Sequence, residues 1–271
     1  MRKSVIAGLA AGVVLALGLG TSATAVESGK AELSVLHGIP ATPVDVWVNG
    51  AKTLDNFMPG DLAGPLTLAP GDYTFVLTAV GDPITSPVLT VGPVALAADT
   101  SYTAVAHLDA AAAPMVSLFT NDISATGAGK GRLTVRHVAA APAVDILAND
   151  AVAFPGLVNP NEVKADLPVG TYAAKVNLAG TATTAIGPAN VDVKAGVNTI
   201  VYAWGNAGSD PSTLALAVQT VNTMGAPAGV SAGSAPLPSD GSSVPAALVV
   251  VSALALIGAG FATRTAIAAR R

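Results

Sequence analysis

Two histidine and aspartate pairs with the same spacing are the residues of this sequence best suited to chemistry. His37 precedes Asp45 by eight residues, and His137 precedes Asp145 by the same distance. An imidazole and a carboxylate that meet in space can bind a cation or orient a proton transfer. They can also form a hydrogen-bonded pair that fixes the loop between two strands. Both interpretations stay open here, and the second is favoured because both copies keep the pair.

The two pairs lie in a duplicated stretch of sequence. Residues 33–50 read LSVLHGIPATPVDVWVNG, and residues 133–150 read LTVRHVAAAPAVDILAND. Apolar residues alternate with other residues in each copy, which predicts strands, and Pro and Gly turns then separate further short strands. The sequence therefore predicts an all-β fold of two tandem antiparallel β-sandwich domains of the immunoglobulin-like kind. We place them at residues 26–123 and 131–221, joined by the linker 124–130.

The duplicated motif resembles the bacterial domain of unknown function 4397 (DUF4397). The positions that carry the resemblance are Val35, His37, Pro43, Val44, Asp45, Val46, Val48, Asn49 and Gly50 in the first copy and Val135, His137, Val144, Asp145, Ile146 and Asn149 in the second. A turn that ends on a tyrosine follows in each copy, at residues 68–73 and 167–172. The resemblance implies an exported, β-rich envelope or secreted protein. It implies no activity, because the family has none established.

Both ends of the chain carry predicted targeting segments. Residues 1–25 combine a basic start, a short apolar run and an Ala-Thr-Ala site, which is typical of a signal peptide. Residues 244–263 are apolar and uncharged, long enough for a transmembrane helix, and the tail 264–271 is basic. Residues 222–243, rich in Gly, Ala, Pro and Ser, predict a stalk. We therefore expect an exported protein of type I topology in the plasma membrane or cell wall, held in the membrane by its C-terminal helix.

A short motif before the apolar segment resembles a sortase sorting signal. It reads Leu237-Pro238-Ser239-Asp240-Gly241, whereas the signal is Leu-Pro-x-Thr-Gly. The sortase attacks the threonine carbonyl, and Asp240 stands at that position. We interpret the motif as a degenerate signal and expect retention by the helix alone.

Composition and context argue against several classes of function. Residues 26–243 hold all 17 acidic residues and eight basic ones, which disfavours nucleic acid as a partner. The chain has no cysteine, so it has neither a disulfide nor a thiol nucleophile. A Gly-x-Ser-x-Gly match at residues 229–233 lies in the predicted stalk, where no base can be held beside the serine. We expect neither an enzyme nor a cofactor.

Two functional hypotheses follow. The first is a non-enzymatic cell-surface protein that displays two β-sandwich domains for adhesion or interaction with an envelope protein or glycan. The alternative is a small-ligand or metal-binding envelope module that uses His37, Asp45, His137 and Asp145.

Some residues differ between the copies and are not required by the shared fold. Trp47 corresponds to Leu147, and Trp204 corresponds to His107. Core filling is the first interpretation of both tryptophans. Positions that differ in this way are nevertheless where we expect contact with a specific partner, if the protein has one.

Overall fold

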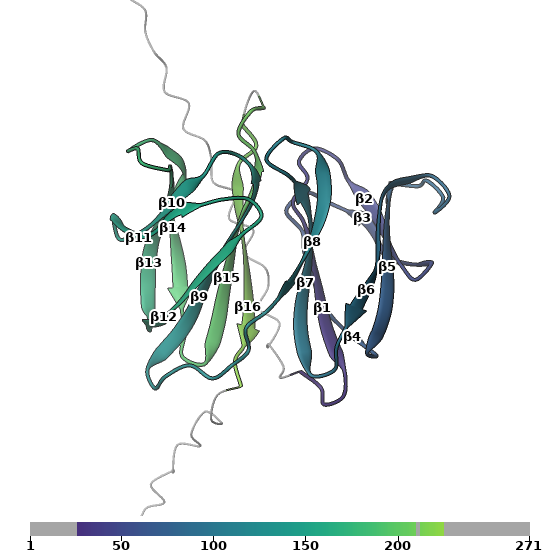
Figure 1. The fold of residues 1–271 in the computed structure, drawn as a ribbon, viewed down its shortest axis with the longest axis horizontal. Helices are drawn as coiled ribbons and strands as arrows, with labels where there is room; N and C mark the ends of the chain where they lie inside the picture. Colours follow the sequence, from purple (N-terminus) through teal and green to yellow (C-terminus); the bar gives the residue numbers. More distant parts are fainter. Residues whose placement is uncertain (1–25, 210–211, 225–271) are drawn as a thin grey trace, which may run out of the picture. The chain divides into compact units, whose positions relative to one another are not determined.

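The computed structural model of this chain describes residues 26–209 and 212–224. The regular secondary structure of these residues consists of strands, which turns and loops connect (Figure 1). The first copy contains β1 (Ala31–His37), β2 (Val44–Val48), β3 (Ala51–Phe57), β4 (Leu62–Leu68), β5 (Gly71–Ala79), β6 (Pro87–Leu96), β7 (Thr100–Leu108) and β8 (Pro114–Thr120). The second contains β9 (Lys130–Ala140), β10 (Val144–Ala148), β11 (Ala151–Leu157), β12 (Glu162–Pro168), β13 (Gly170–Leu178), β14 (Thr184–Val193), β15 (Val197–Asn206) and β16 (Ala215–Asn222).

The predicted targeting segments fall outside the described residues. This applies to the signal peptide, the apolar segment 244–263, the sortase-like motif and most of the predicted stalk. Within ranges 26–209 and 212–224, no helix has the length and apolar character needed to cross a membrane.

Each copy folds into two four-stranded sheets that pack face to face. In the first copy the sheet orders are β4-β1-β7-β8 and β3-β2-β5-β6, and in the second they are β12-β9-β15-β16 and β11-β10-β13-β14. The same connections therefore occur twice, as the sequence repeat requires. The prediction of an all-β chain built from two β-sandwiches is confirmed. The immunoglobulin-like type stays a prediction.

The prediction that all pairing is antiparallel is wrong at one place in each copy. β1 runs parallel to β7, from Ala31 beside Thr100 to His37 beside Ala106, and β9 runs parallel to β15 in the same way. The chain crosses to the other sheet between these strands, so no hairpin connects them. Alternation of apolar residues is the same in both kinds of pairing, and the sequence pattern alone therefore did not reveal the parallel pair.

Three apolar clusters hold the structure together. One fills the first sandwich around Leu33, Val46 and Phe75, and a second fills the other sandwich. The third joins Leu36 and Val105 of the first copy to residues of the second copy that include Val138, Ile200 and Tyr202. All seven residues of β1 are buried, because its sheet packs on its own partner sheet on one face and on the second sandwich on the other.

Side-chain hydrogen bonds to the backbone hold the turns at the ends of the hairpins. Asn49 has a φ of 48° and Gly50 a φ of 85°, which suits the tight turn between β2 and β3, and the Asn49 side-chain oxygen accepts the backbone N–H of Thr74 at 2.8 Å. The hydroxyls of Tyr73 and Tyr172 donate to backbone carbonyls four residues earlier, at 2.8 and 2.9 Å. These contacts fix the hairpin ends in both copies.

Gly92 occupies a crowded bend in β6, and alanine there is expected to destabilise the first sandwich. Its φ is 134°, and an added Cβ would lie 2.7 Å from the carbonyl oxygen of Tyr73. An alanine at this position has an unfavourable φ, and its Cβ clashes with the backbone of Tyr73. Gly92→Ala should therefore lower the free energy of unfolding by on the order of 2–3 kcal/mol. Gly50→Ala is the control, since Gly50 also has positive φ but has open space around its α-carbon, and about 1 kcal/mol is expected there. Urea unfolding followed by circular dichroism measures both, and equal losses would show that crowding at Gly92 is unimportant.

Candidate functional site

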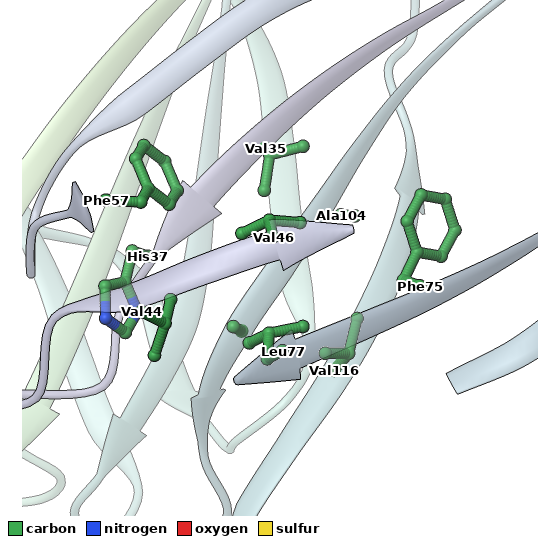
Figure 2. Close-up of a pocket in the computed structure, with 10 residues that line it drawn as sticks. Val35, His37, Val44, Val46, Phe57, Phe75, Leu77, Ala104 and Val116 are labelled. Carbon is green, nitrogen blue, oxygen red and sulfur yellow. The ribbon is translucent and has the colours of Figure 1, made fainter. Parts of the chain in front are cut away.

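His37 ends β1 and holds the loop that follows it. The side chain is fully buried, and its Nε2 donates to the carbonyl oxygen of Thr42 at 2.7 Å. Its ring stacks on Phe57 with 5.8 Å between the centroids, and both rings lie at the edge of the first core (Figure 2). Burial lowers the pKa of His37, against the opposing effects of the Thr42 hydrogen bond and the Asp61 charge. The imidazole is therefore neutral and structural in character.

His137 repeats this arrangement in the second copy. Its Nε2 donates to the carbonyl oxygen of Pro142 at 3.0 Å, and burial lowers its pKa. The equivalence is local, since in each copy the carbonyl belongs to the residue five positions after the histidine. Each histidine thus fixes the turn between the first two strands of its sandwich.

Asp45 lies on β2 and binds three groups on other elements. Its carboxylate accepts from the Lys52 ammonium at 2.6 Å, the backbone N–H of Asn56 at 2.8 Å and the backbone N–H of Gly81 at 3.1 Å. These hydrogen bonds, led by the one from Lys52, lower the pKa of Asp45 to about 2. The carboxylate connects β2 to β3 and to the turn after β5.

Asp145 makes backbone contacts equivalent to those of Asp45, but valine replaces the lysine that contacts Asp45. It accepts the N–H groups of Gly156 and Gly180, each at 2.8 Å, and these two bonds lower its pKa. Val152 stands where Lys52 stands in the first copy. The feature common to both copies is therefore a carboxylate that holds two backbone groups in place.

The predicted histidine and aspartate pairs are not joined in the part of the chain that the structure describes. His37 and Asp45 have different partners and no hydrogen bond to each other, and His137 and Asp145 behave alike. Residues 26–209 and 212–224 also contain no group of three or more histidine and carboxylate side chains that could hold a metal ion. Each of the four residues instead binds backbone groups of its own sandwich, so the predicted bond between histidine and aspartate is not what fixes the loops.

Removal of the Asp45 carboxylate should destabilise the first sandwich more than removal of its cation. Asp45→Ala leaves two backbone N–H groups without their acceptor and leaves the Lys52 ammonium with Asp55 as its carboxylate partner, and we expect a loss of about 2 kcal/mol in the free energy of unfolding. Lys52→Ala removes a partly exposed ammonium and should cost less than about 1 kcal/mol. Guanidinium unfolding of both variants measures the difference. A loss in Lys52→Ala as large as that in Asp45→Ala would mean that the ion pair, and not the backbone contacts, carries the stabilisation.

A second polar cluster lies where the two sandwiches meet, and sequence reasoning did not identify it. Arg136 is fully buried there, and its guanidinium lies 4.4 Å from the ring centroid of Phe119 in the first sandwich. It donates to Glu162 and to the hydroxyl of Tyr202, each at 2.8 Å. The carboxylate and the aromatic ring together compensate a charge that would otherwise be costly to bury.

Hydrogen bonds from this cluster cross to the first sandwich. Tyr202 donates to the side-chain oxygen of Gln219 at 2.5 Å, and the same oxygen lies 3.0 Å from the hydroxyl of Thr103 on β7. Asn159 of the second copy also donates to the carbonyl oxygen of Leu108, at 2.8 Å. The interface is therefore both apolar and hydrogen-bonded, like the core of a single domain.

The residues that differ between the copies account for this interface. Trp204 packs against Gly38 and Gly60, where an added Cβ would lie 3.3 Å and 2.9 Å from atoms of the tryptophan side chain. The counterpart of Gly38 is Val138 and the counterpart of Trp204 is His107. At both positions the second copy therefore has the larger side chain. Trp47 behaves differently, since it stays half-buried with its indole N–H donating to Thr78 at 3.2 Å. The signal for the interface was present in the sequence as the mismatch between copies.

The fold and these clusters define an all-β protein of two docked sandwiches whose polar residues serve mainly its own architecture. A family model described as Domain of unknown function (DUF4397) matches residues 31–147 of the chain. The match covers the first sandwich together with β9 and most of β10. The comparison with curated proteins found no match.

Proposed function

We propose that this chain is a non-enzymatic cell-surface protein that displays its two docked sandwiches for adhesion or another contact within the envelope. The observation that carries the proposal is the use of its candidate reactive groups. His37, His137, Asp45 and Asp145 each bind backbone groups of their own sandwich, which supports a structural use of these side chains. The β-rich DUF4397 fold is consistent with an envelope protein.

The sequence at both ends supports the location. A signal-like start, an apolar segment near the C-terminus and a basic tail suit export and retention in the membrane. The docked interface supports the display role, because two sandwiches fixed to each other present their outer sheets as one rigid surface. Covalent attachment to a wall through the motif at residues 237–241 stays a secondary part of the proposal.

Protease treatment of intact bacteria that express the full chain tests the location. We expect external protease to degrade the protein while a cytoplasmic marker survives, and deletion of residues 244–271 to release it into the medium. Full protection in intact cells would contradict the proposal. Adhesion is then tested with the same cells on immobilised envelope material, compared with cells that lack the protein; equal retention of both would leave no adhesive role.

The metal-binding alternative has weaker support in the geometry. Nε2 of each histidine is already bound to a carbonyl oxygen, and neither ring is exposed. A cation would have to open the loop and compete with that hydrogen bond. Calorimetry with Zn²⁺ on the full chain and on the His37→Ala and His137→Ala variants distinguishes the cases: heat that vanishes in the variants would favour the alternative.

A further inference from the structure

The second sandwich contains an apolar cavity of about 90 Å³, whereas a cavity in the first, lined in part by equivalent residues, is about 20 Å³. Side chains of both its sheets surround the cavity, with Ile146, Phe154, Val176 and Val191 among them. The difference is large for two copies of one fold, because protein interiors have few voids larger than a water molecule.

The cavity has an identifiable cause in the sequence. In the first sandwich, Val48 and Phe75 are paired across β2 and β5, and the phenyl ring lies among the residues around the small cavity (Figure 2). In the second, the equivalent pair across β10 and β13 is Ala148 and Ala174. Two bulky side chains are thus replaced by two methyl groups at one point of the core.

Two residues that do not face the core also contribute to the wall of the cavity. Leu147 and Lys175 contribute to its wall, although they alternate along their strands with the core-facing residues Ile146 and Ala174. Because the alanine pair has little side-chain volume, it leaves the core unfilled beside the hydrogen-bonded strands β10 and β13.

We propose that this cavity is a binding site for a small uncharged apolar group, such as a compact hydrocarbon or the apolar end of a larger molecule. An apolar cavity of about 150 Å³ in another protein stays free of water and takes up benzene or xenon. The cavity here is about 90 Å³, which suits xenon and compact hydrocarbons rather than a drug-sized ligand. Lys175, the charged residue in its wall, is paired with Asp150, so it is already neutralised by a carboxylate.

Xenon binding to the full chain, followed by NMR of labelled methyl groups, tests the proposal. We expect saturable shifts of the methyl signals of Ile146, Val176 and Val191, with no comparable shifts of Val46 and Leu77 in the first core. Ala174→Phe restores the ring of the first copy and should weaken xenon binding at least tenfold. Val169→Phe adds the same ring at a position that is 51% exposed and should leave binding unchanged.

The outcomes are decisive in either direction. Absence of saturable shifts at pressures of several bar would overturn the site, and so would shifts that persist in Ala174→Phe. If that variant does not fold, Ala148→Val restores the other residue of the pair and serves in its place. The result is independent of the display role, because xenon uptake requires neither export nor adhesion.

Discussion

Replacement of Arg136 with leucine is expected to lower the free energy of unfolding by about 3 kcal/mol, the lower end of the range for buried ion pairs that lose one partner, because Glu162 is itself partly exposed. The substitution leaves the Glu162 carboxylate and the Tyr202 hydroxyl without the donor they share. It also removes the guanidinium that lies over Phe119 of the first sandwich. Leucine is the residue of the first copy at this position, Leu36, so the strand itself accepts it. Thermal and urea unfolding of the full chain measure the loss.

Lys164→Ala provides the matched control at the same interface. Lys164 contacts Asp122 across the two copies, but its side chain is 48% exposed, and a loss below about 1 kcal/mol is expected. Arg136→Leu should in addition increase hydrogen exchange at β7 and β15, whose facing surfaces lose their cover. A variant as stable as the wild type would show that the apolar contacts alone hold the sandwiches together.

Acid is expected to destabilise the protein well above the range in which carboxylates titrate. His37, His107 and His137 are buried, and burial lowers the pKa of each below 6.5 in the folded state. The unfolded chain binds protons at these residues as the pH falls below 6.5, while the folded protein binds them only at a lower pH. Stability is therefore complete above 6.5 and decreases below it, with a limiting slope of about 1.4 kcal/mol per pH unit for each histidine that stays neutral in the folded state.

The charges near the histidines do not reverse the loss of stability in acid, and the carboxylates act at lower pH. Asp61 and Asp109 raise the pKa of His37 and His107 slightly, and His137 lowers that of His107, but burial is the largest effect on each. Asp45, with a pKa of about 2, adds an acid-sensitive contribution only below 3.8. Burial raises the pKa of Glu32, which opposes the trend near its own titration.

Urea unfolding at several pH values between 7.5 and 5 measures the slope. A His107→Gln variant should remove about one third of it, because one of the three protons is lost. In the wild type, Nδ1 of His107 donates to the carbonyl oxygen of Leu108 and Nε2 accepts from Ser117, both at 2.9 Å, which holds the neutral ring. Stability that is flat between pH 7.5 and 5 would contradict the assignment of these histidines as buried and neutral.

The contrast between shared and differing residues bears on where a partner could bind. Residues that differ between the copies were expected to mark a partner surface. Instead, Arg136, Trp204 and Gly38 join one copy to the other, so this surface is already occupied within the chain. Trp47 remains half-buried on the first sandwich, with the Lys52 ammonium 5.2 Å from its ring centroid, and is a differing aromatic residue that a partner could reach.

The sequence by itself determined the features that depend on neighbouring residues. Strands follow from alternation, the turn at Asn49 and Gly50 follows from residues that tolerate positive φ, and the hydroxyl of Tyr73 reaches a carbonyl four residues away. The loop-fixing interpretation of His37 was also within reach, because its partner lies five residues further on. Contacts between residues so close in sequence are largely determined by the local backbone conformation.

Only the tertiary structure decided which strands and which copies meet. The parallel pairing of β1 with β7, the separate partners of His37 and Asp45, and the burial of Arg136 between two sandwiches all depend on residues far apart in the chain. The same is true of the cavity beside Ala174, since its volume is the balance of side chains from both sheets of one sandwich. Local preference cannot fix these features, because the free energy that selects them comes from burial shared by distant segments.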